Sequence, residues 1–470
     1  MISLSNKYKG LSIILILLVL TFIGYNALKK DDLKEATWEK NKEILAITID
    51  GEEVSSFPTT KNYTASVTCT KGSGTASWNG SKWVFNVTGI NQAKTKCNVN
   101  FEIIPTWDTP KAGTLLAAIK RDNTVTSTLT TPGAEASLAS EAVLASTQDD
   151  YGTSYYFRGA VQNNFVEYAN MCWRIVRVTG DGSIKLVLYN YNGLTSTNNT
   201  PSSSTPCNVT GDDYAYARYE GDTYKSAFNS SYKDNAYVGL MYGTASASSY
   251  AEAHANTNAS TILTNLNKWY TNVLSKQANF KDSQLADTIW CNDKSVVTDA
   301  TFNPDGYTLG ANYGYGTNIN YYSATKRLQS TSGRAGGTGP SLICPNDNNG
   351  GKLSKFTVSD TTYGNGALSG YAKVGLLTAD EIAFAGGAYS TANSTYYIKG
   401  NTNSSWWWAL SPNDFNGNKA RVWGVIGDFG VLGYGLVSKV GGVWPSLSLN
   451  SGVKISSGNG SSTNPYKIAA

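Results

Sequence analysis

The residue types that could do chemistry are sparse in this chain. Its single histidine, His254, lies in a polar stretch rich in Ala and Asn. One imidazole cannot build a zinc site with several histidines, and any Ser-His-Asp hydrolase would have to use this one residue. The motifs G-x-S-x-G, H-E-x-x-H, G-x-G-x-x-G and the P-loop are missing from the sequence. The sequence therefore predicts a protein that is not an enzyme.

Carboxylate and amide oxygens form a second set of candidates, because such groups can bind calcium. The pairs that could do so are Asn292-Asp293, Asn346-Asp347 and Asn413-Asp414. None fits a spaced calcium-loop motif, and Asn/Asp/Gly clusters are also common in turns. A structural calcium ion and plain turn chemistry both remain open, and no other cofactor is expected. Paired carboxylates for glycoside hydrolysis also stay open, since Asp and Glu are scattered along the chain.

Six cysteines, an even number, fit disulfide pairing in an oxidising compartment. Cys69 and Cys97 each lie inside a strand pattern of a small N-terminal module. A bridge between them would staple a module that is small for its core, and we expect this pair. Two unrelated buried thiols are the alternative.

The other four cysteines are Cys172, Cys207, Cys291 and Cys344. Cys291 (IWCNDK) and Cys344 (LICPND) lie in similar apolar-then-polar contexts, which suits a bridge that anchors a long loop. Cys172 and Cys207 then remain to pair by elimination. Four cysteines allow three connectivities, so the sequence does not decide among them. A zinc site built from all four thiolates is the alternative, although no C-x-x-C spacing is present.

Length and composition indicate what kind of fold must position these residues. The chain has 470 residues, enough for two or three domains. Charged residues make up 15% of the sequence, against about 25% in a typical protein. The net charge is +4, and basic residues are spread rather than gathered in a patch, which argues against nucleic-acid binding. Many Tyr, Gly, Ser, Thr and Asn residues suggest a β-rich secreted or surface protein.

The N-terminus carries a candidate membrane anchor. Residues 10–28 have no charge, and a helix of this length spans about 30 Å of hydrocarbon. We expect an uncleaved transmembrane helix here, with residues 1–9 as a cytoplasmic tail and residues 29–45 as a stalk. A cleaved signal peptide is the alternative, but its best cleavage site would place bulky Tyr25 three residues before the cut.

The count of basic residues around this segment favours the opposite orientation. Two lysines precede it, and the lysines that follow it are Lys29, Lys30, Lys34 and Lys40. The even number of cysteines and the polar-aromatic composition favour export instead. We expect the bulk of the chain to be extracellular.

Period-two alternation and turn signals divide the rest of the chain. Residues 46–104 read as a small β-sandwich of the immunoglobulin-like kind. Residues 105–150, with Pro105, Pro110 and Pro132, read as a linker that holds a short helical LLAAIK and a weak helix over 134–145. A main body covers 151–450, with a long surface insertion at about 192–260 and a tail at 451–470.

Several elements of the body have clear local signals. Gly180-Asp181-Gly182 predicts a hairpin turn between two central strands. The segment SYAEAHANTNASTILTNLNKWYTNVL has helical spacing after residue 260 and predicts a helix packed on a sheet. In LLTADEIAFAGG, Thr378 and Glu381 predict a capping box at the start of a short helix that ends at Gly386.

Ordered motifs in the body carry a resemblance. NNFVEYANMCWRIVRVTGDGSIKLV, LLTADEIAFAGG, WWWALSP, ARVWGV and GVWPSLSL follow one another over about residues 150–450. In this order they resemble a large group of Gram-positive and mollicute surface proteins, which read W-R-I-V-R-I-N-G-D-G-S-I-R-L, then W-x-L-S-P and G-V-R-P-x-(I/L)-x-L. The closing motifs are similar to those of the C-type-lectin-like fold, shared by bacterial surface binders and formylglycine-generating enzymes. Trp444 stands where that group usually has Arg.

The resemblance does not extend to catalysis. Formylglycine-generating enzymes use a copper site with cysteines near the C-terminus, and this chain has no cysteine after Cys344. What the resemblance implies is a lectin-like body that binds a ligand on a bacterial cell surface.

The stretch RVWGVIGDFGVLGYGLVSKVGGVW is the most unusual part of the body. Relatives have polar turns here, whereas this chain places large apolar side chains among glycines, as a diversified ligand-binding face would. A buried hairpin is the plain alternative. The residues expected to bind ligand are Trp423, Ile426, Phe429, Val431, Tyr434, Leu436 and Trp444.

The triplet Trp406-Trp407-Trp408 is a related candidate, because aromatic faces can pack against sugars. In a strand the outer two side chains point to one face and the middle one to the other. At least one face is then core.

The sequence as a whole predicts a mainly β protein with a few helices, made of a transmembrane helix, a small β-sandwich and a C-type-lectin-like body. We expect a membrane-anchored surface protein that binds an extracellular protein or glycan and no nucleic acid. A glycan-processing enzyme and a purely structural envelope protein are the alternatives. Two carboxylates about 5–9 Å apart in a cleft would favour the enzyme, and an exposed apolar patch near residues 424–443 the binder.

Overall fold

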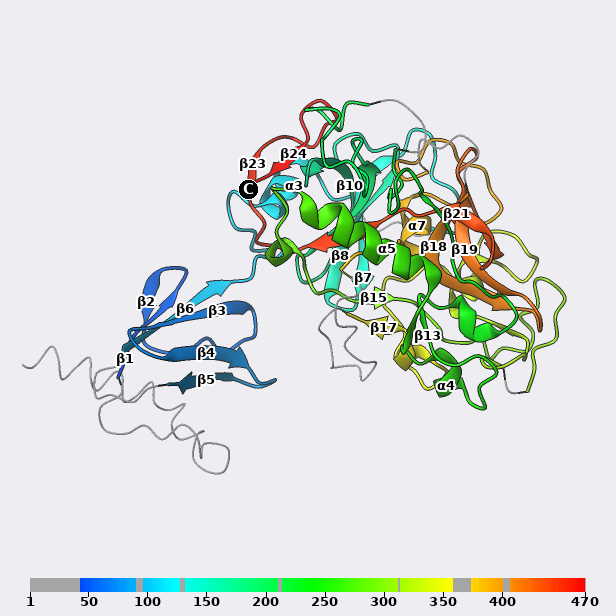
Figure 1. Cartoon of the computed structure of the whole chain (residues 1–470), viewed down its shortest axis with the longest axis horizontal. Coiled ribbons are helices and arrows are strands. Elements are labelled where there is room, and N and C mark those ends of the chain that lie inside the picture. Colours follow the sequence, from blue (N-terminus) through cyan, green and yellow to red (C-terminus); the bar gives the residue numbers. More distant parts are fainter. Residues whose placement is uncertain are drawn as a thin grey trace, which may run out of the picture. The chain divides into compact units, whose positions relative to one another are not determined.

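The computed structural model describes residues 43–89, 96–126, 132–209, 214–311, 313–357, 373–399 and 406–469. Strands hold 36% of the residues and helices 13%, so the predicted mainly β class is confirmed. The chain divides into two compact units, residues Met1–Ile104 and Pro105–Ala470 (Figure 1).

The first unit consists of short antiparallel and parallel strands around a small core. Its four-stranded sheet has the order β2-β1-β6-β3, and β4 pairs with β5 in a separate hairpin. The strands are β1 (Glu43–Ile49), β2 (Glu52–Val54), β3 (Tyr63–Cys69), β4 (Ser73–Trp78), β5 (Trp83–Thr88) and β6 (Lys96–Ile103).

The core of this unit is small and is reinforced covalently. Ile47, Val99 and Phe101 are buried, and the Trp83 ring packs on Phe101 at 5.0 Å between centroids. Cys69 and Cys97 face each other across β3 and β6 and form a disulfide. The expected pair is thus present. A module with so few buried side chains gains stability from such a bridge.

The second unit contains an eight-stranded sheet at its centre. The path runs β22-β11-β10-β9-β24-β23, with β8 pairing β10 and β7 pairing β8. The strands are β7 (Ala142–Asp149), β8 (Gly152–Gly159), β9 (Phe165–Tyr168), β10 (Met171–Val178), β11 (Ile184–Asn190), β22 (Ser446–Leu449), β23 (Ile455–Ser457) and β24 (Tyr466–Ile468). Every residue of β10 is buried, as expected for a central strand, and the β10–β11 turn has Gly182 at φ 86°.

A second sheet of six strands carries the C-terminal motifs. Its order is β12-β21-β18-β19-β20, and β16 pairs with β18. The strands are β12 (Lys225–Ala227), β16 (Asn320–Tyr321), β18 (Trp406–Phe415), β19 (Ala420–Ile426), β20 (Val431–Leu436) and β21 (Val440–Gly442). Two small sheets pair β13 (Met241–Tyr242) with β14 (Asn258–Ala259) and β15 (Trp290–Cys291) with β17 (Lys355–Phe356). One hydrophobic cluster joins residues of both large sheets.

Short helices pack around these sheets. They are α3 (Leu115–Asp122), α4 (Tyr250–His254), α5 (Thr261–Asn272), α6 (Ser323–Leu328) and α7 (Ala379–Ala385). The helix after residue 260 is confirmed: Ser260 caps α5, and Trp269 packs against Trp173 of β10. The capping box is confirmed too, since Thr378 and Glu381 bond reciprocally at the start of α7. 3₁₀ turns are η2 (Asn235–Val238), η3 (Leu274–Lys276), η4 (Asp282–Gln284) and η5 (Gly351–Leu353).

Three segments differ from what their composition predicts. The presumed linker 105–150 instead supplies α3 and β7 to the second unit, and Leu115 and Ile119 are fully buried. The presumed surface insertion 192–260 contributes β12 and the buried Phe228 to the core. The presumed tail 451–470 forms β23 and β24, which extend the eight-stranded sheet.

The common physical reason is that these segments are too irregular to show periodicity. Short apolar runs within these three segments lie in the core. Strands that are neighbours in space form the backbone hydrogen bonds that such short runs cannot form within themselves.

The expected N-terminal tail and anchor, residues 1–28, lie outside the described residues, as does most of the stalk. Strand β1 begins at Glu43, inside the range expected for the stalk. Within the described part of the chain, no helix has the length and apolar character needed to cross a bilayer.

A buried ionic network joins the eight-stranded sheet to α7. Glu381 accepts from Arg177 at 3.0 Å and from Lys185 at 2.8 Å, and Arg177 also bonds Asp149 at 2.7 Å. The four side chains are at most 10% exposed. Burial alone would raise the pKa of Glu381, but Lys185 and Arg177 lower it to about 2. The carboxylate is therefore charged and links β10, β11 and α7.

Replacing this carboxylate should destabilise the second unit strongly. We expect Glu381→Gln to keep the cap of α7 but leave two buried cations without their shared partner, lowering the free energy of unfolding by about 3–5 kcal/mol. Urea unfolding followed by tryptophan fluorescence measures this. The matched control is Glu220→Gln, at an exposed pair with Lys268, which should cost less than about 1 kcal/mol. Equal effects of the two changes would contradict the role of Glu381.

The same carboxylate should make stability fall in acid. The pKa of Glu381 is depressed to about 2 in the folded protein, while an unfolded glutamate titrates near about 4.3. The unfolded chain thus binds the proton first as pH falls, so this contribution is complete above about pH 4.3 and disappears toward pH 2. Unfolding midpoints measured between pH 6 and 2 should fall less steeply in Glu381→Gln than in the wild type; parallel curves would show that Glu381 is not responsible.

Candidate functional site

The ligand face expected from the sequence lies on the β19–β20 hairpin. The two strands pair antiparallel, and the register puts Trp423 opposite Tyr434 and Ile426 opposite Val431. Gly430 in the connecting turn has φ 61°, and a Cβ there would lie 2.0 Å from the Asn393 carbonyl oxygen. The turn therefore requires glycine, which fixes the hairpin tip against the neighbouring loop.

One face of the hairpin continues across three strands. Trp406 of β18, Ile426 of β19 and Val431 of β20 are directly opposite one another in register, so their side chains share this face. The Trp406 ring packs against Trp408 and against glycine backbone: a Cβ on Gly424 would lie 2.4 Å from it and a Cβ on Gly441 2.3 Å. The glycines thus form a flat floor on which the indole lies.

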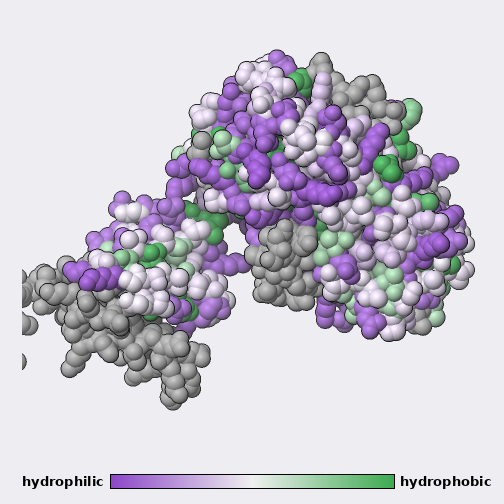
Figure 2. Space-filling view, viewed as in Figure 1, coloured by the Kyte–Doolittle hydropathy of each residue, from purple (hydrophilic) through white to green (hydrophobic). Residues whose placement is uncertain are grey.

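Apolar side chains are exposed around the end of this face. Within the described residues, seven large apolar side chains are exposed: Leu138, Tyr151, Tyr214, Ile343, Ile426, Phe429 and Val440. Three of them fall within residues 426–440, where Phe429 is 60% exposed and Ile426 41%. Hydrophobic side chains are visible on the side of the body where β19 and β21 lie (Figures 1 and 2). We call Trp406, Ile426, Phe429 and Val431 the hairpin rim.

The opposite face of the hairpin is aromatic and charged. Tyr434 lies 6.2 Å from buried Trp423 and stacks on Tyr389 at 6.1 Å with an interplanar angle of 12°. Arg421 lies over the Tyr434 ring and forms an ion pair with Asp414. Burial raises the pKa of Asp414 to about 6, against the opposing effect of Arg421. This face packs on the body.

The seven residues expected to bind ligand therefore do not form one surface. Ile426 and Phe429 are exposed, and Val431, Tyr434 and Leu436 are partly buried. Trp423 and Trp444 are buried, so neither indole lies on the surface of this structure. Trp444 packs on Trp407 at 4.5 Å, and its Nε1 donates to the Leu188 carbonyl oxygen. The indole here fills core space between the two large sheets.

The tryptophan triplet divides as strand geometry requires. Trp406 and Trp408 lie on the same face, 5.3 Å apart, whereas Trp407 packs against Trp444 on the other. Trp407 and Trp408 are buried, and Trp406 is partly exposed. One member of the triplet is thus available at the surface.

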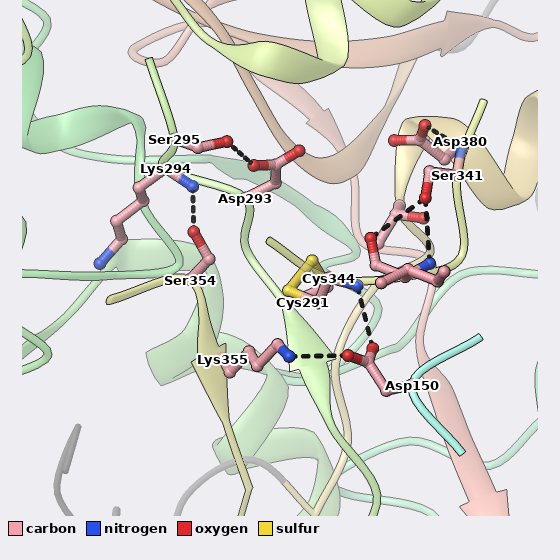
Figure 3. The surroundings of a disulfide bond; sticks show 12 residues. Asp150, Cys291, Asp293, Lys294, Ser295, Ser341, Cys344, Ser354, Lys355 and Asp380 are labelled. Atoms are coloured by element: carbon pink, nitrogen blue, oxygen red, sulfur yellow. Dashed lines mark hydrogen bonds and ion pairs between the residues drawn. A yellow bond between two sulfur atoms is a disulfide. The ribbon is translucent and has the colours of Figure 1, made fainter. Parts of the chain in front are cut away.

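Two of the three pairs considered for calcium, Asn292-Asp293 and Asn346-Asp347, lie in the segments joined by the Cys291–Cys344 disulfide. In the third pair, Asp414 forms an ion pair with Arg421. Asn292 Oδ1 accepts from the Leu240 amide, and the Asp293 carboxylate accepts from Ser295 and Arg327. Figure 3 shows Asp293 and Ser295 beside this disulfide.

The second pair lies in a turn. Asp347 Oδ1 accepts from the Asn349 and Gly351 amides, and Asn346 is exposed. These are turn and ion-pair contacts. Across the described segments, no group of three or more His, Cys, Asp or Glu residues gathers as metal ligands would.

The disulfide anchors the 341–347 loop over a small polar cavity. Cys344 and Cys291 are bonded, the Cys344 amide donates to Asp150, and Asp150 also pairs with Lys355 (Figure 3). The cavity measures ≈ 20 Å³, room for about one water. Its charged lining residues are Arg177, Lys185, Asp293, Arg327, Asp380 and Glu381. Each carboxylate among them is paired with an arginine or a lysine.

The remaining disulfide joins Cys172 and Cys207, so the structure selects one of the three connectivities that the sequence left open for these four cysteines. The sequence did not indicate the participation of Arg421, Tyr389 or Asp305 in the hairpin's inner face. Asp305 and Tyr389 come from loops without periodicity, and only the three-dimensional arrangement brings them to Arg421. Comparisons with family models, curated proteins and solved structures found no match for this chain.

The glycine floor of the hairpin can be tested with two facing positions. Gly424→Ala would bring Cβ to 2.4 Å from the Trp406 ring and 2.5 Å from the Trp407 carbonyl oxygen, and should cost about 1–3 kcal/mol of stability. Gly433, directly opposite, has nothing within 4 Å of its Cβ position, so Gly433→Ala should change stability by less than about 0.5 kcal/mol. Thermal unfolding with near-ultraviolet circular dichroism measures both. A harmless Gly424→Ala would mean that Trp406 does not rest on the glycines.

Proposed function

We propose that this chain is a surface protein of a bacterial cell, anchored by residues 10–28, that binds an extracellular protein or glycan without covalent chemistry. The observation that carries the proposal is the hairpin rim. Ile426 and Phe429 are exposed at the tip of a rigid hairpin, next to Val431 and the partly exposed Trp406. Exposed apolar groups gathered on a well-packed frame are typical of interaction sites.

The frame under the rim supports this interpretation. Trp408, Trp423 and Val425 are fully buried beneath or beside the rim, and Gly430 locks the turn. The rim residues therefore lose little conformational freedom on binding, which lowers the entropic cost of recognition. A flexible loop with the same residues would bind less tightly.

The extracellular location is supported by the cysteines. All six are paired. Disulfides of this number persist in oxidising compartments and are rare in the cytosol. The uncharged segment 10–28 fits an anchor of matching length.

The proposed C-type-lectin-like body rests on the ordered motifs, and these coincide with central elements. WRIVRV is β10, ADEIAFA is α7, WWWALSP opens β18 and ARVWGV lies in β19. The motifs thus occupy the positions on which the packing of the body depends. The pairing of the cavity carboxylates with Arg177, Lys185 and Arg327 favours binding over glycan hydrolysis, because a general acid or nucleophile must reach its substrate.

The test is ligand capture by the purified full-length chain. The chain is applied to a glycan array and to extracts of host surface proteins, and the same is done with an Ile426→Ser, Phe429→Ser double variant. Because truncating central apolar contacts usually costs more than 1 kcal/mol each, we expect the variant to lose at least about tenfold in affinity.

The matched control is Leu138→Ser with Ile343→Ser, two exposed apolar residues outside the hairpin. It should bind as the wild type does. Equal loss of binding in both variants would indicate non-specific apolar adsorption. Saturable binding that survives the rim changes would place recognition elsewhere on the protein. Repeating the assay with chelator separates a calcium-dependent ligand from the rim.

A further inference from the structure

Lys294 is a buried lysine, and among the described residues no carboxylate forms an ion pair with its side chain. Its backbone amide donates to Ser354 Oγ at 2.6 Å, and Figure 3 shows the side chain directed away from the Cys291–Cys344 disulfide. The residue is fully buried. Among the described residues, its ammonium nitrogen contacts two oxygens, the His254 carbonyl at 2.8 Å and Asn256 Oδ1 at 2.7 Å.

This environment disfavours a charged amine. Moving an ammonium ion out of water without a counter-ion costs several kcal/mol, and a buried lysine responds by losing its proton. Burial lowers the pKa of Lys294 to about 7. A neutral lysine amine near neutral pH is a nucleophile, and burial restricts it to groups already in contact.

The group in contact is the side-chain amide of Asn256. Asn256 is 8% exposed, and its Nδ2 donates to the Leu353 carbonyl oxygen at 3.3 Å, which orients the amide plane. Gly239 packs closely against the Lys294 side chain, because a Cβ on Gly239 would lie 2.9 Å from Lys294 Cε. The amine and the amide oxygen are therefore held in hydrogen-bond contact by their surroundings, with the amide carbon one bond away.

A neutral imidazole completes the surroundings. His254 lies two residues before Asn256 and is fully buried. Burial and then the charge of Lys294 hold the pKa of His254 well below its usual range. Its Nε2 lies 3.2 Å from the Tyr322 hydroxyl. The imidazole therefore stays neutral near pH 7 and adds no second positive charge to this buried region.

We propose that Lys294 and Asn256 join in an intramolecular amide bond that forms without a cofactor. The Nζ lone pair of Lys294 forms a bond to Cγ of Asn256, and the carbonyl electrons move to Oδ1. A proton from Nζ passes to Nδ2, the Cγ–Nδ2 bond breaks as the carbonyl reforms, and ammonia leaves. One amine and one carboxamide give one secondary amide and one ammonia, with no oxidant or reductant.

Such a bond would connect two regions that the sheets do not join directly. Asn256 follows α4, and Lys294 follows β15 and its disulfide at Cys291. The closed loop would restrain the 256–294 segment, which includes α5, against unfolding. This restraint would persist after the disulfides are reduced. This cross-link goes beyond the binding function and does not depend on it.

The test is the intact mass of the purified full-length chain after reduction of its disulfides. We expect a mass lower than the sequence mass by one ammonia. A tryptic digest should then contain residues 234–268 joined to residues 282–326, because a lysine in an amide bond resists trypsin. The full sequence mass, with the two peptides separate, would overturn the proposal.

Three variants make the assignment specific. Lys294→Met and Asn256→Ala should each have their full sequence mass. Lys355→Met is the matched control: Lys355 is a buried lysine ion-paired with Asp150, and its loss should leave the mass deficit in place. A ring closed by Asn256 on its own backbone would also release ammonia, but that deficit would persist in Lys294→Met and would contradict the cross-link.

Discussion

The second unit depends on one buried carboxylate. Glu381 bonds Arg177 of β10 and Lys185 of β11, and it also accepts the Thr378 amide at the start of α7. The three elements that carry the first two ordered motifs therefore meet at a single charged group. Burying these charges is costly one by one, and only their mutual pairing makes the arrangement stable. The strands and the helix must consequently adopt this geometry together, which specifies their relative placement.

The hairpin rim follows from a different constraint, the space left by missing side chains. Trp406 can lie across the sheet because Gly424, Gly435 and Gly441 leave the floor free. The Trp406 ring covers these glycines but does not cover Ile426 and Phe429, which remain exposed. Apolar exposure at the tip is thus a result of how the aromatic residues and glycines are ordered along β18, β19 and β20.

Local signals in the sequence were sufficient for the elements with strong patterns. The capping box at Thr378, the β10–β11 turn and helix α5 were predicted because caps, glycine turns and helical periodicity act over a few residues. The Cys69–Cys97 pair was expected from its module, whereas the connectivity of the other four cysteines was left open by the sequence. The short helix α3 was indicated by LLAAIK, but its place in the core was not, and β24 lies in a segment predicted to be a tail. Both elements are short and are stabilised by partners far along the chain. Trp444 was predicted at a surface and is core for the same reason: its neighbours Trp407 and Leu188 are distant in sequence.

The order of the cysteine pairs has a consequence for biosynthesis. Cys69–Cys97, Cys172–Cys207 and Cys291–Cys344 each join cysteines that are consecutive along the chain. During the export that the proposed location requires, the N-terminal cysteine of each pair emerges first and its partner is the next to follow. An oxidase that links thiols in order of emergence would make every native bond directly. The chain should therefore mature without a disulfide isomerase.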